Sequence, residues 1–85
     1  MKKFTVLWQE DAEAELATLW EQSEDRNYLA DSANKIDQVL GESADKVGES
    51  REKSERILFH DNLAVHYRVW LADRRVMVQE IWFVG

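Results

Sequence analysis

The sequence predicts an α+β fold in a single domain over residues 1–85: a helical hairpin packed on one face of a small, mainly antiparallel four-stranded sheet. Two observations predict this class. The first half of the chain has one segment of alternating apolar residues, followed by two apolar stripes at helical spacing. The second half has three alternating segments separated by short polar turns. The expected element order is therefore β-α-α-β-β-β.

The segment Lys3–Gln9 is rich in β-branched and aromatic residues and alternates, which predicts the first strand. Two apolar stripes follow: Ala12, Leu16, Leu19 and Trp20, and then Leu29, Ala33, Ile36 and Leu40. At roughly 100° per residue the two stripes face different directions, so one straight helix could not bury both. We expect the helix to break near Ser23–Arg26, with Asp25 as the N-cap of the second helix and Gly41 just past its end.

The segment Glu42–Lys53 is polar and has no periodicity, which predicts a loop long enough to suggest a functional role. Three strands are expected after it, at Ser54–His60, Leu63–Leu71 and Arg75–Val84. The last strand runs almost to the C-terminus, so no tail is expected beyond it. Its apolar residues change phase between Val78 and Ile81, which predicts a β-bulge near Gln79–Glu80.

The pairing of the strands that flank the first turn decides which side chains face away from the helices, because a slip of one residue exchanges the two faces. A two-residue turn after His60 would direct Arg56 toward the helices. A three-residue turn would instead direct the apolar Ile57 and Phe59 toward the helices, and we favour it because it buries more apolar surface. This register places Arg56 opposite Arg68.

The sheet face away from the helices is then expected to carry ionisable and aromatic side chains. These are Arg56, Leu58, His60, His66, Arg68, Trp70, Glu80 and Trp82. Glu80 is expected beside Arg56 and Arg68, where it would offset the repulsion of two like charges across a strand pair. The simplest interpretation is a solvated face on which Glu80 bridges the two arginines.

The same face is also a candidate site for phosphate chemistry, with Arg56, His66, Arg68 and Glu80 as catalytic residues. RNA cleavage needs a base for the 2′-OH, a cation for the phosphorane and an acid for the leaving oxygen. His66 or His60 would act as base or acid, the arginines would clamp one phosphate, and Glu80 would orient a histidine. The spacing of the histidines and Glu80 is not diagnostic of a metal site, so no metal is expected.

Five residues are expected to contact a partner or a nucleic acid: Arg51, Lys53, His60, Trp70 and Trp82. The two tryptophans lie on an uncovered face, so they would stack on a base or be buried by a bound protein or a second copy of the chain. Arg51 and Lys53, near the end of the loop, would steer an anionic target. By contrast, Trp8 and Trp20 have apolar neighbours and are expected in the core.

Composition bounds the class of protein. The chain has no Cys, which excludes disulfides and thiol chemistry and fits a reducing compartment, and no cofactor is expected. The net charge of −6 argues against general nucleic-acid binding, which needs cations to neutralise phosphate. The first apolar run stops at Trp8, too early for a signal peptide, and no stretch approaches the roughly 20 apolar residues of a membrane span. We therefore expect a cytoplasmic protein with no membrane partner.

Essentially the whole chain, from about Lys3 to Trp82, resembles the RelE/ParE superfamily, the toxins of bacterial type II toxin–antitoxin pairs. The resemblance is carried by FTVLWQ, DAEAELATLW and ANKIDQVL, and then by VGESREKSERILF and LAVHYRVWLADRRVMVQEIW. It implies a growth inhibitor that a cognate antitoxin neutralises and that acts either by ribosome-dependent mRNA cleavage or on DNA gyrase. A toxin-like fold that serves as a non-catalytic binding module is the alternative, and a homodimer is also expected as an option.

The ribonuclease branch implies a basic residue on the second strand, an Arg early on the third, and Arg or His with Tyr after the last. Arg56 matches the second-strand position. The third-strand position falls at about Ala64, with Arg68 further along, and the final positions have no counterpart before Gly85. The resemblance thus implies the fold and the toxin class, together with an incomplete set of ribonuclease residues.

Overall fold

The computed structural model describes residues 3–52 and 54–84. It has two helices and five strands: β1 (Thr5–Trp8), α1 (Glu10–Gln22), α2 (Arg26–Ser43), β2 (Glu49–Ser50), β3 (Glu55–His60), β4 (Leu63–Trp70) and β5 (Arg75–Phe83). The predicted α+β class is confirmed, and the additional element is the two-residue β2 within the segment predicted as a loop. In the described part of the chain, neither helix is long and apolar enough to cross a membrane.

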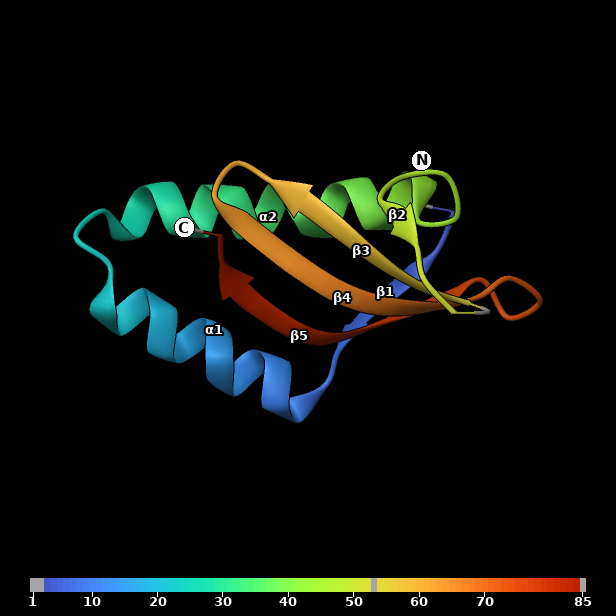
Figure 1. Ribbon diagram of the computed structural model, residues 1–85, viewed down its shortest axis with the longest axis horizontal. Helices are drawn as coiled ribbons and strands as arrows, with labels where there is room; N and C mark the ends of the chain where they lie inside the picture. The colour runs from blue at the N-terminus through green and yellow to red at the C-terminus, as the bar shows by residue number, and fades with distance from the viewer. Residues whose placement is uncertain (1–2, 53, 85) are drawn as a thin grey trace.

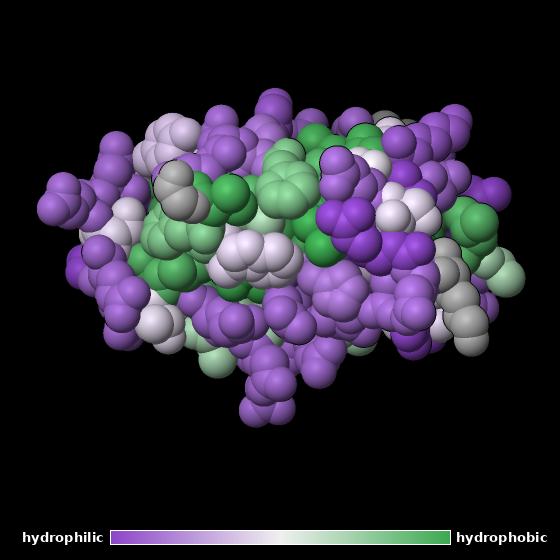
Figure 2. All heavy atoms as spheres, in the orientation of Figure 1, coloured by the Kyte–Doolittle hydropathy of each residue, from purple (hydrophilic) through white to green (hydrophobic). Residues whose placement is uncertain are grey.

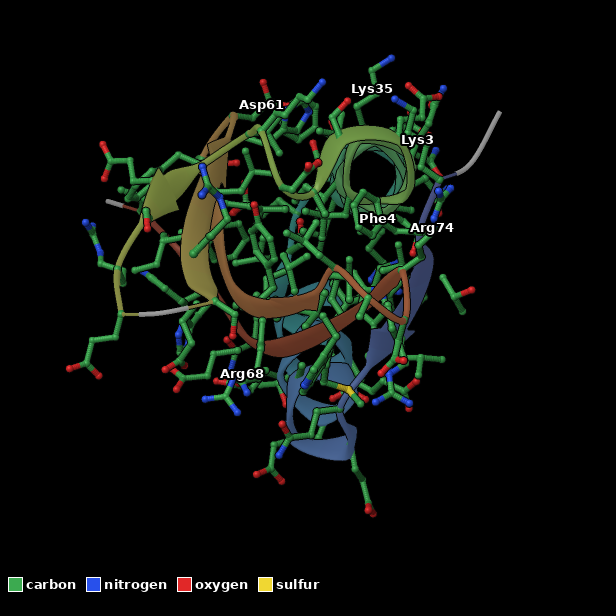
Figure 3. The ribbon with its side chains drawn as sticks, turned by 90° about the vertical axis from the view of Figure 1, so that its right-hand side faces the viewer. Lys3, Phe4, Lys35, Asp61, Arg68 and Arg74 are labelled. Atoms are coloured by element: carbon green, nitrogen blue, oxygen red, sulfur yellow. The ribbon has the colours of Figure 1, made fainter. Side chains whose placement is uncertain are left out.

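The strands form one sheet in the order β1-β5-β4-β3-β2, in which β1 runs parallel to β5 and the other neighbours are antiparallel. Figure 1 shows α2 running along this sheet and α1 at an angle to α2. In Figure 3, which looks along α2, the strands curve around that helix. The helices therefore cover one side of the sheet, and we call the opposite side the open face.

Both helices begin where the sequence predicts. α1 carries Glu10, Asp11 and Glu13 in its first turn, where negative charge interacts favourably with the helix dipole. α2 follows Asp25, whose carboxylate accepts a hydrogen bond from the Tyr28 N–H at 3.0 Å. Asp25 is therefore the predicted N-cap, and it separates the two apolar stripes into two helices.

The end of α2 differs from the prediction. Gly41 was expected just past the helix, but α2 continues to Ser43 and Gly41 is buried inside it. The Gly41 carbonyl oxygen accepts hydrogen bonds from the N–H groups of Lys3 and Phe4, at 2.7 and 2.9 Å. These bonds hold the entry to β1 against α2, and Figure 3 shows Phe4 between that helix and the sheet.

One hydrophobic core lies between α2 and the covered side of the sheet. Its largest fully buried side chains are Tyr67, Leu29, Ile36, Leu40, Leu63, Ile81, Val65, Val76 and Val78. They come from one stripe of α2 and from alternate positions of β4 and β5, as the periods of a helix and a strand require. Ala12 brings α1 into the same core, with Leu16 and Leu19 packed at its margin.

The loop between α2 and β3 is fastened to this core through Tyr67. The hydroxyl of Tyr67 lies 3.0 Å from the carbonyl oxygen of Ala44 and 2.9 Å from that of Val47, so the buried donor has acceptors. Burial raises the pKa of Tyr67. Gly48 has a φ of +74°, and a Cβ there would lie 2.7 Å from the Ile57 carbonyl oxygen, so the loop needs glycine at this point.

The pairing of β3 with β4 is where the sequence prediction is wrong. The connecting turn has two residues, because His60 pairs directly with Leu63. Arg56 therefore pairs with Tyr67 on the covered side of the sheet, and Glu55 pairs with Arg68 on the open face. The three-residue turn, which would have placed Arg56 opposite Arg68, does not form.

Two local features account for the shorter turn. Asp61 adopts a φ of 54°, in the left-handed region that aspartate tolerates better than most residues. Its carboxylate accepts a hydrogen bond from the Ser32 hydroxyl of α2 at 3.0 Å, and Figure 3 shows Asp61 on the α2 side of the sheet. The cost is that Phe59 remains 50% exposed on the open face. Burial of that ring, the reason for favouring the longer turn, therefore does not decide the register.

The predicted bulge in the last strand is confirmed. His66 pairs with Glu80, whereas the next residue, Tyr67, pairs with Val78. Gln79 is thus the extra residue, and it lets Val78 and Ile81 both face the core although they are separated by an odd number of positions.

Candidate functional site

The open face carries rows of side chains that run across β3, β4 and β5. In register order the rows are Phe59, Ala64 and Trp82; Ile57, His66 and Glu80; Glu55, Arg68 and Met77; and finally Trp70 and Arg75. The first row is apolar and the later rows are ionic. Figure 2 shows this side of the molecule, with apolar and weakly polar residues gathered over the ends of β3 and β5 and hydrophilic residues around them.

An ionic cluster occupies the middle of the open face. Oε1 of Glu55 lies 2.9 Å from Nε2 of His66, and Oε2 of Glu55 lies 3.5 Å from Nη2 of Arg68. The side chains of Glu55 and His66 are 22% and 24% exposed, so the pair is largely shielded from water. Figure 3 shows Arg68 on the side of the sheet away from α2. Sequence reasoning missed Glu55, although the two-residue turn would have placed it beside Arg68.

Glu80 does not take the role predicted for it. It pairs in register with His66, but its side chain is exposed and makes no ion pair with any described residue. It lines a shallow hollow together with Asp11 and Glu15 of α1. The carboxylate that offsets the charge of Arg68 is therefore that of Glu55.

Arg56 is the predicted catalytic residue that the structure separates from the others. It lies on the covered side, where its Nε donates to the Val47 carbonyl oxygen at 2.8 Å and its Nη2 to the Gly48 carbonyl oxygen at 3.2 Å. These bonds fasten the loop before β3. Because Arg56 and Arg68 lie on opposite sides of the sheet, they cannot clamp one phosphate.

His60 also lies on the covered side rather than on the open face. Its Nε2 is 3.4 Å from Oδ2 of Asp61, the carboxylate that also accepts from Ser32. His60 and His66 thus face opposite ways and cannot share a substrate or a metal. Of the two residues predicted to steer an anionic target, Arg51 forms an exposed ion pair with Glu49 at 3.1 Å, and Lys53 lies outside the described residues.

The two tryptophans of the open face have different surroundings. The guanidinium carbons of Arg68 and Arg75 lie 5.9 and 5.1 Å from the centroid of the Trp70 ring, within the range of cation–π attraction. Trp82 is half-buried in the apolar row, where it pairs with the buried Ala64. Trp70 therefore belongs to the ionic part of the face and Trp82 to the apolar part.

A second candidate site lies between the two helices, and sequence reasoning did not anticipate it. This helical groove has a volume of about 530 Å³ and an apolar floor with an acidic rim. The floor is Trp8, Leu16, Ala17, Trp20, Leu29, Ala30 and Ala33, and the rim is Glu13, Glu21, Asn34 and Asp37. The apolar stripes gave no signal for this groove, because they do not fix the angle between the two helices.

The two tryptophans of the helical groove are not both in the core, as had been predicted. Trp8 is half-buried against the core, and its indole N–H donates to Oδ1 of Asp37 at 3.3 Å. Trp20 is 43% exposed, and the guanidinium of Arg26 lies over its ring at 4.6 Å from the centroid. A large exposed ring in an apolar groove is typical of a protein-binding site.

Comparison with protein-family models and with curated proteins finds no match. Solved structures with the same fold exist. Over 98% of its length the chain is similar to 98% of a chain from the chromosomal ParDE TA system of P. aeruginosa, with a TM-score of 0.76 and 15% identity. It is similar over 98% of its length to 93% of a chain of the toxin–antitoxin complex RelBE2 from Mycobacterium tuberculosis, with a TM-score of 0.78 and 19% identity.

A third similar structure is TrmO from P. aeruginosa, with a TM-score of 0.63 and 17% identity. Here the chain spans 34% of the other protein. The end-to-end likeness to the two toxin–antitoxin complexes confirms a RelE/ParE-like fold. The match to part of TrmO illustrates that such a fold can host more than one function, so the function must be argued from the sites.

Proposed function

We propose that this chain is the toxin-type member of a type II toxin–antitoxin pair, and that it inhibits growth by binding a protein rather than by cleaving RNA. The observation that carries the proposal is the end-to-end fold likeness to chains of two toxin–antitoxin complexes, at TM-scores of 0.76 and 0.78. A protein partner of antitoxin type is supported by the helical groove. A mode of action without RNA cleavage is supported by the charge balance of the open face.

The helical groove supports a protein partner of antitoxin type. Its floor is apolar, its rim is acidic, and α1 has no cation between Glu10 and Gln22. An amphipathic segment with an apolar stripe and several Lys or Arg side chains would complement both properties. Trp20 would be its anchor, because partly exposed tryptophans at groove centres tend to carry much of the binding free energy.

The open face supports a mode of action without RNA cleavage. Stabilising a phosphorane requires cations that are not already neutralised, yet Glu55 pairs with both His66 and Arg68. Arg56 faces the other way, and the position early on β4 is the buried Ala64. The adjoining apolar row resembles the core of a protein–protein interface more than a nucleic-acid groove. A protein target, as in the gyrase-directed branch, therefore fits better than ribosome-bound mRNA.

The proposal is tested by inducing the chain alone in a bacterium and following viable counts. Growth arrest is expected, and mapping of mRNA 5′ ends during the arrest should reveal no new cleavage sites. New cleavage sites would restore the ribonuclease alternative. Normal growth despite abundant folded protein would contradict the toxin assignment and favour the non-catalytic binding module.

A further inference from the structure

The Glu55 carboxylate lies where an incoming anion would bind the open face. One oxygen contacts the imidazole of His66 at 2.9 Å and the other contacts the guanidinium of Arg68 at 3.5 Å. Imidazole and guanidinium N–H groups are also the donors that bind phosphate oxygens. Glu55 thus contacts the imidazole of His66 and the guanidinium of Arg68 at once, in the manner of a bound oxyanion.

Arg68 is not fully satisfied by this arrangement. Its Nε is buried and, within the described part of the chain, has no hydrogen-bond acceptor. The contact of Nη2 with Glu55 is long at 3.5 Å, so the guanidinium is bound end-on by one oxygen. The rest of the Arg68 side chain is partly exposed, and a phosphate could accept side by side from its Nη groups, although the buried Nε is out of reach. The cluster could therefore bind a larger oxyanion more completely than it binds Glu55.

The neighbouring residues extend the cluster along β4 and β5. Arg75 lies over the same Trp70 ring as Arg68, and its ion pair with Asp73 is long at 3.9 Å and exposed. A ring flanked by cations is a common element of single-stranded nucleic-acid sites, where the ring stacks on a base and the cations follow the backbone. Apart from Glu55, this part of the open face has the chemistry of a phosphate-binding strip.

We propose that Glu55 is a specificity-determining residue that closes the open face to phosphate. By supplying an internal carboxylate to His66 and Arg68, it excludes nucleic acid from this face and leaves the adjoining apolar row to a protein. The claim that the apolar row is left to a protein rests on the proposed function and deepens it. The claim that Glu55 excludes nucleic acid concerns binding alone, so it can be tested apart from any effect on growth.

The test compares Glu55→Gln with the wild type by fluorescence anisotropy of a labelled single-stranded RNA of about 12 nucleotides at low salt. Glutamine has nearly the same shape and removes the charge. The variant is expected to bind the RNA at least about tenfold more tightly than the wild type, and the gain should disappear as salt rises. Adding Arg68→Ala to Glu55→Gln should abolish the gain.

Glu80→Gln is the matched control, because it removes one negative charge from the same face, opposite His66, at a side chain that pairs with no charge among the described residues. Its affinity for RNA is expected to stay within about twofold of the wild type, because an exposed charge is screened by water and salt. Equal gains in Glu55→Gln and Glu80→Gln would overturn the inference, since net charge alone would then explain them. Wild-type binding that depends on Arg68 would also overturn it.

Folding of each variant is checked by far-ultraviolet circular dichroism. If Glu55→Gln does not fold, Glu55→Ala takes its place, because it also removes the carboxylate from His66 and Arg68. A folded Glu55→Ala without any gain in RNA affinity would overturn the inference. If RNA binding behaves as expected but the chain does not arrest growth, the proposed function fails while the role of Glu55 in excluding phosphate stands.

Discussion

The open face and the helical groove both expose a tryptophan and apolar surface, but they carry charge in opposite ways. On the open face, Glu55 lies within 2.9 Å of His66 and 3.5 Å of Arg68, so opposite charges balance within the chain. Around the helical groove the rim has carboxylates from both helices, and α1 contributes no cation. Glu55 has its partners within the chain, whereas α1 brings only carboxylates to the groove rim.

This difference indicates that the ionic residues of the open face contribute to stability and the acidic residues of the groove rim to partner binding. Ion pairs formed inside the chain stabilise the chain itself, to the extent that they are shielded from water. Glu13 and Glu21 of α1, at the rim of an apolar groove, would attract a cationic segment. Substitutions on the open face should therefore change the free energy of unfolding, whereas substitutions on the groove rim should change partner binding.

The largest effect is expected from the core beneath both surfaces. Ile36 of α2 is fully buried, and Ile36→Ala should lower the free energy of unfolding by about 2–5 kcal/mol through lost burial and a cavity. Chemical denaturation measures this, with the exposed neighbour Lys35→Ala as a control expected to change stability by less than about 0.5 kcal/mol. If Ile36→Ala behaved like the control, the two surfaces would not share this core.

Tyr67→Phe should be the next most costly change, because it removes the buried donor that holds the loop after α2. A loss of about 1 kcal/mol is expected at neutral pH. Burial raises the pKa of Tyr67 in the folded chain, so the unfolded chain releases this proton first and stability falls as pH rises above about 10. The variant should show a shallower loss in that range in pH-dependent denaturation, and an unchanged slope would contradict the assignment.

Glu55→Gln tests whether the ion pairs of the open face stabilise the chain. We expect it to reduce the free energy of unfolding by about 1 kcal/mol, because both partners lose a largely shielded counter-charge. Glu80→Gln removes an exposed carboxylate that forms no ion pair within residues 3–52 and 54–84, and should stay within about 0.5 kcal/mol of the wild type. Identical stabilities of the two variants in urea denaturation would mean that the open face is not internally balanced.

Glu21→Lys sharpens the comparison at the groove and has the smallest expected effect on stability. It places a cation in the last turn of α1, which has no basic residue, and should stabilise the helix by about 0.3–0.5 kcal/mol. The same charge reversal should weaken binding of a cationic partner segment, so co-expression of the partner should rescue growth less well. Full rescue of growth would argue that the partner binds elsewhere.

The sequence predicted both helices and four of the five strands, but it did not predict β2 or the register of β3. The stripes on α1 and α2, the Asp25 cap and the bulge at Gln79 follow local rules of spacing and capping, and all are found. The register instead depends on Asp61, whose left-handed backbone and bond to Ser32 involve a residue far away in the chain. Such a contact cannot be read from the alternation of the strands alone.

That one register error explains most of the differences at the candidate site. With β3 shifted, Arg56 and His60 move to the covered side and Glu55 moves beside Arg68. His66, Arg68, Trp70 and Trp82 remain on the open face as predicted, because their alternation on β4 and β5 does not depend on the turn. The helical groove was missed because apolar stripes predict contact between helices and do not give the angle at which they separate.

The most direct test of the account is the viable count after induction of the wild-type chain and of the His66→Ala, Arg68→Ala double variant. The double variant removes the ionic groups of the open face that RNA cleavage would need and leaves the apolar row of Phe59, Ala64 and Trp82. Binding to a protein target predicts that both chains arrest growth to a similar extent. Arrest by the wild type with normal growth of a folded double variant would contradict it.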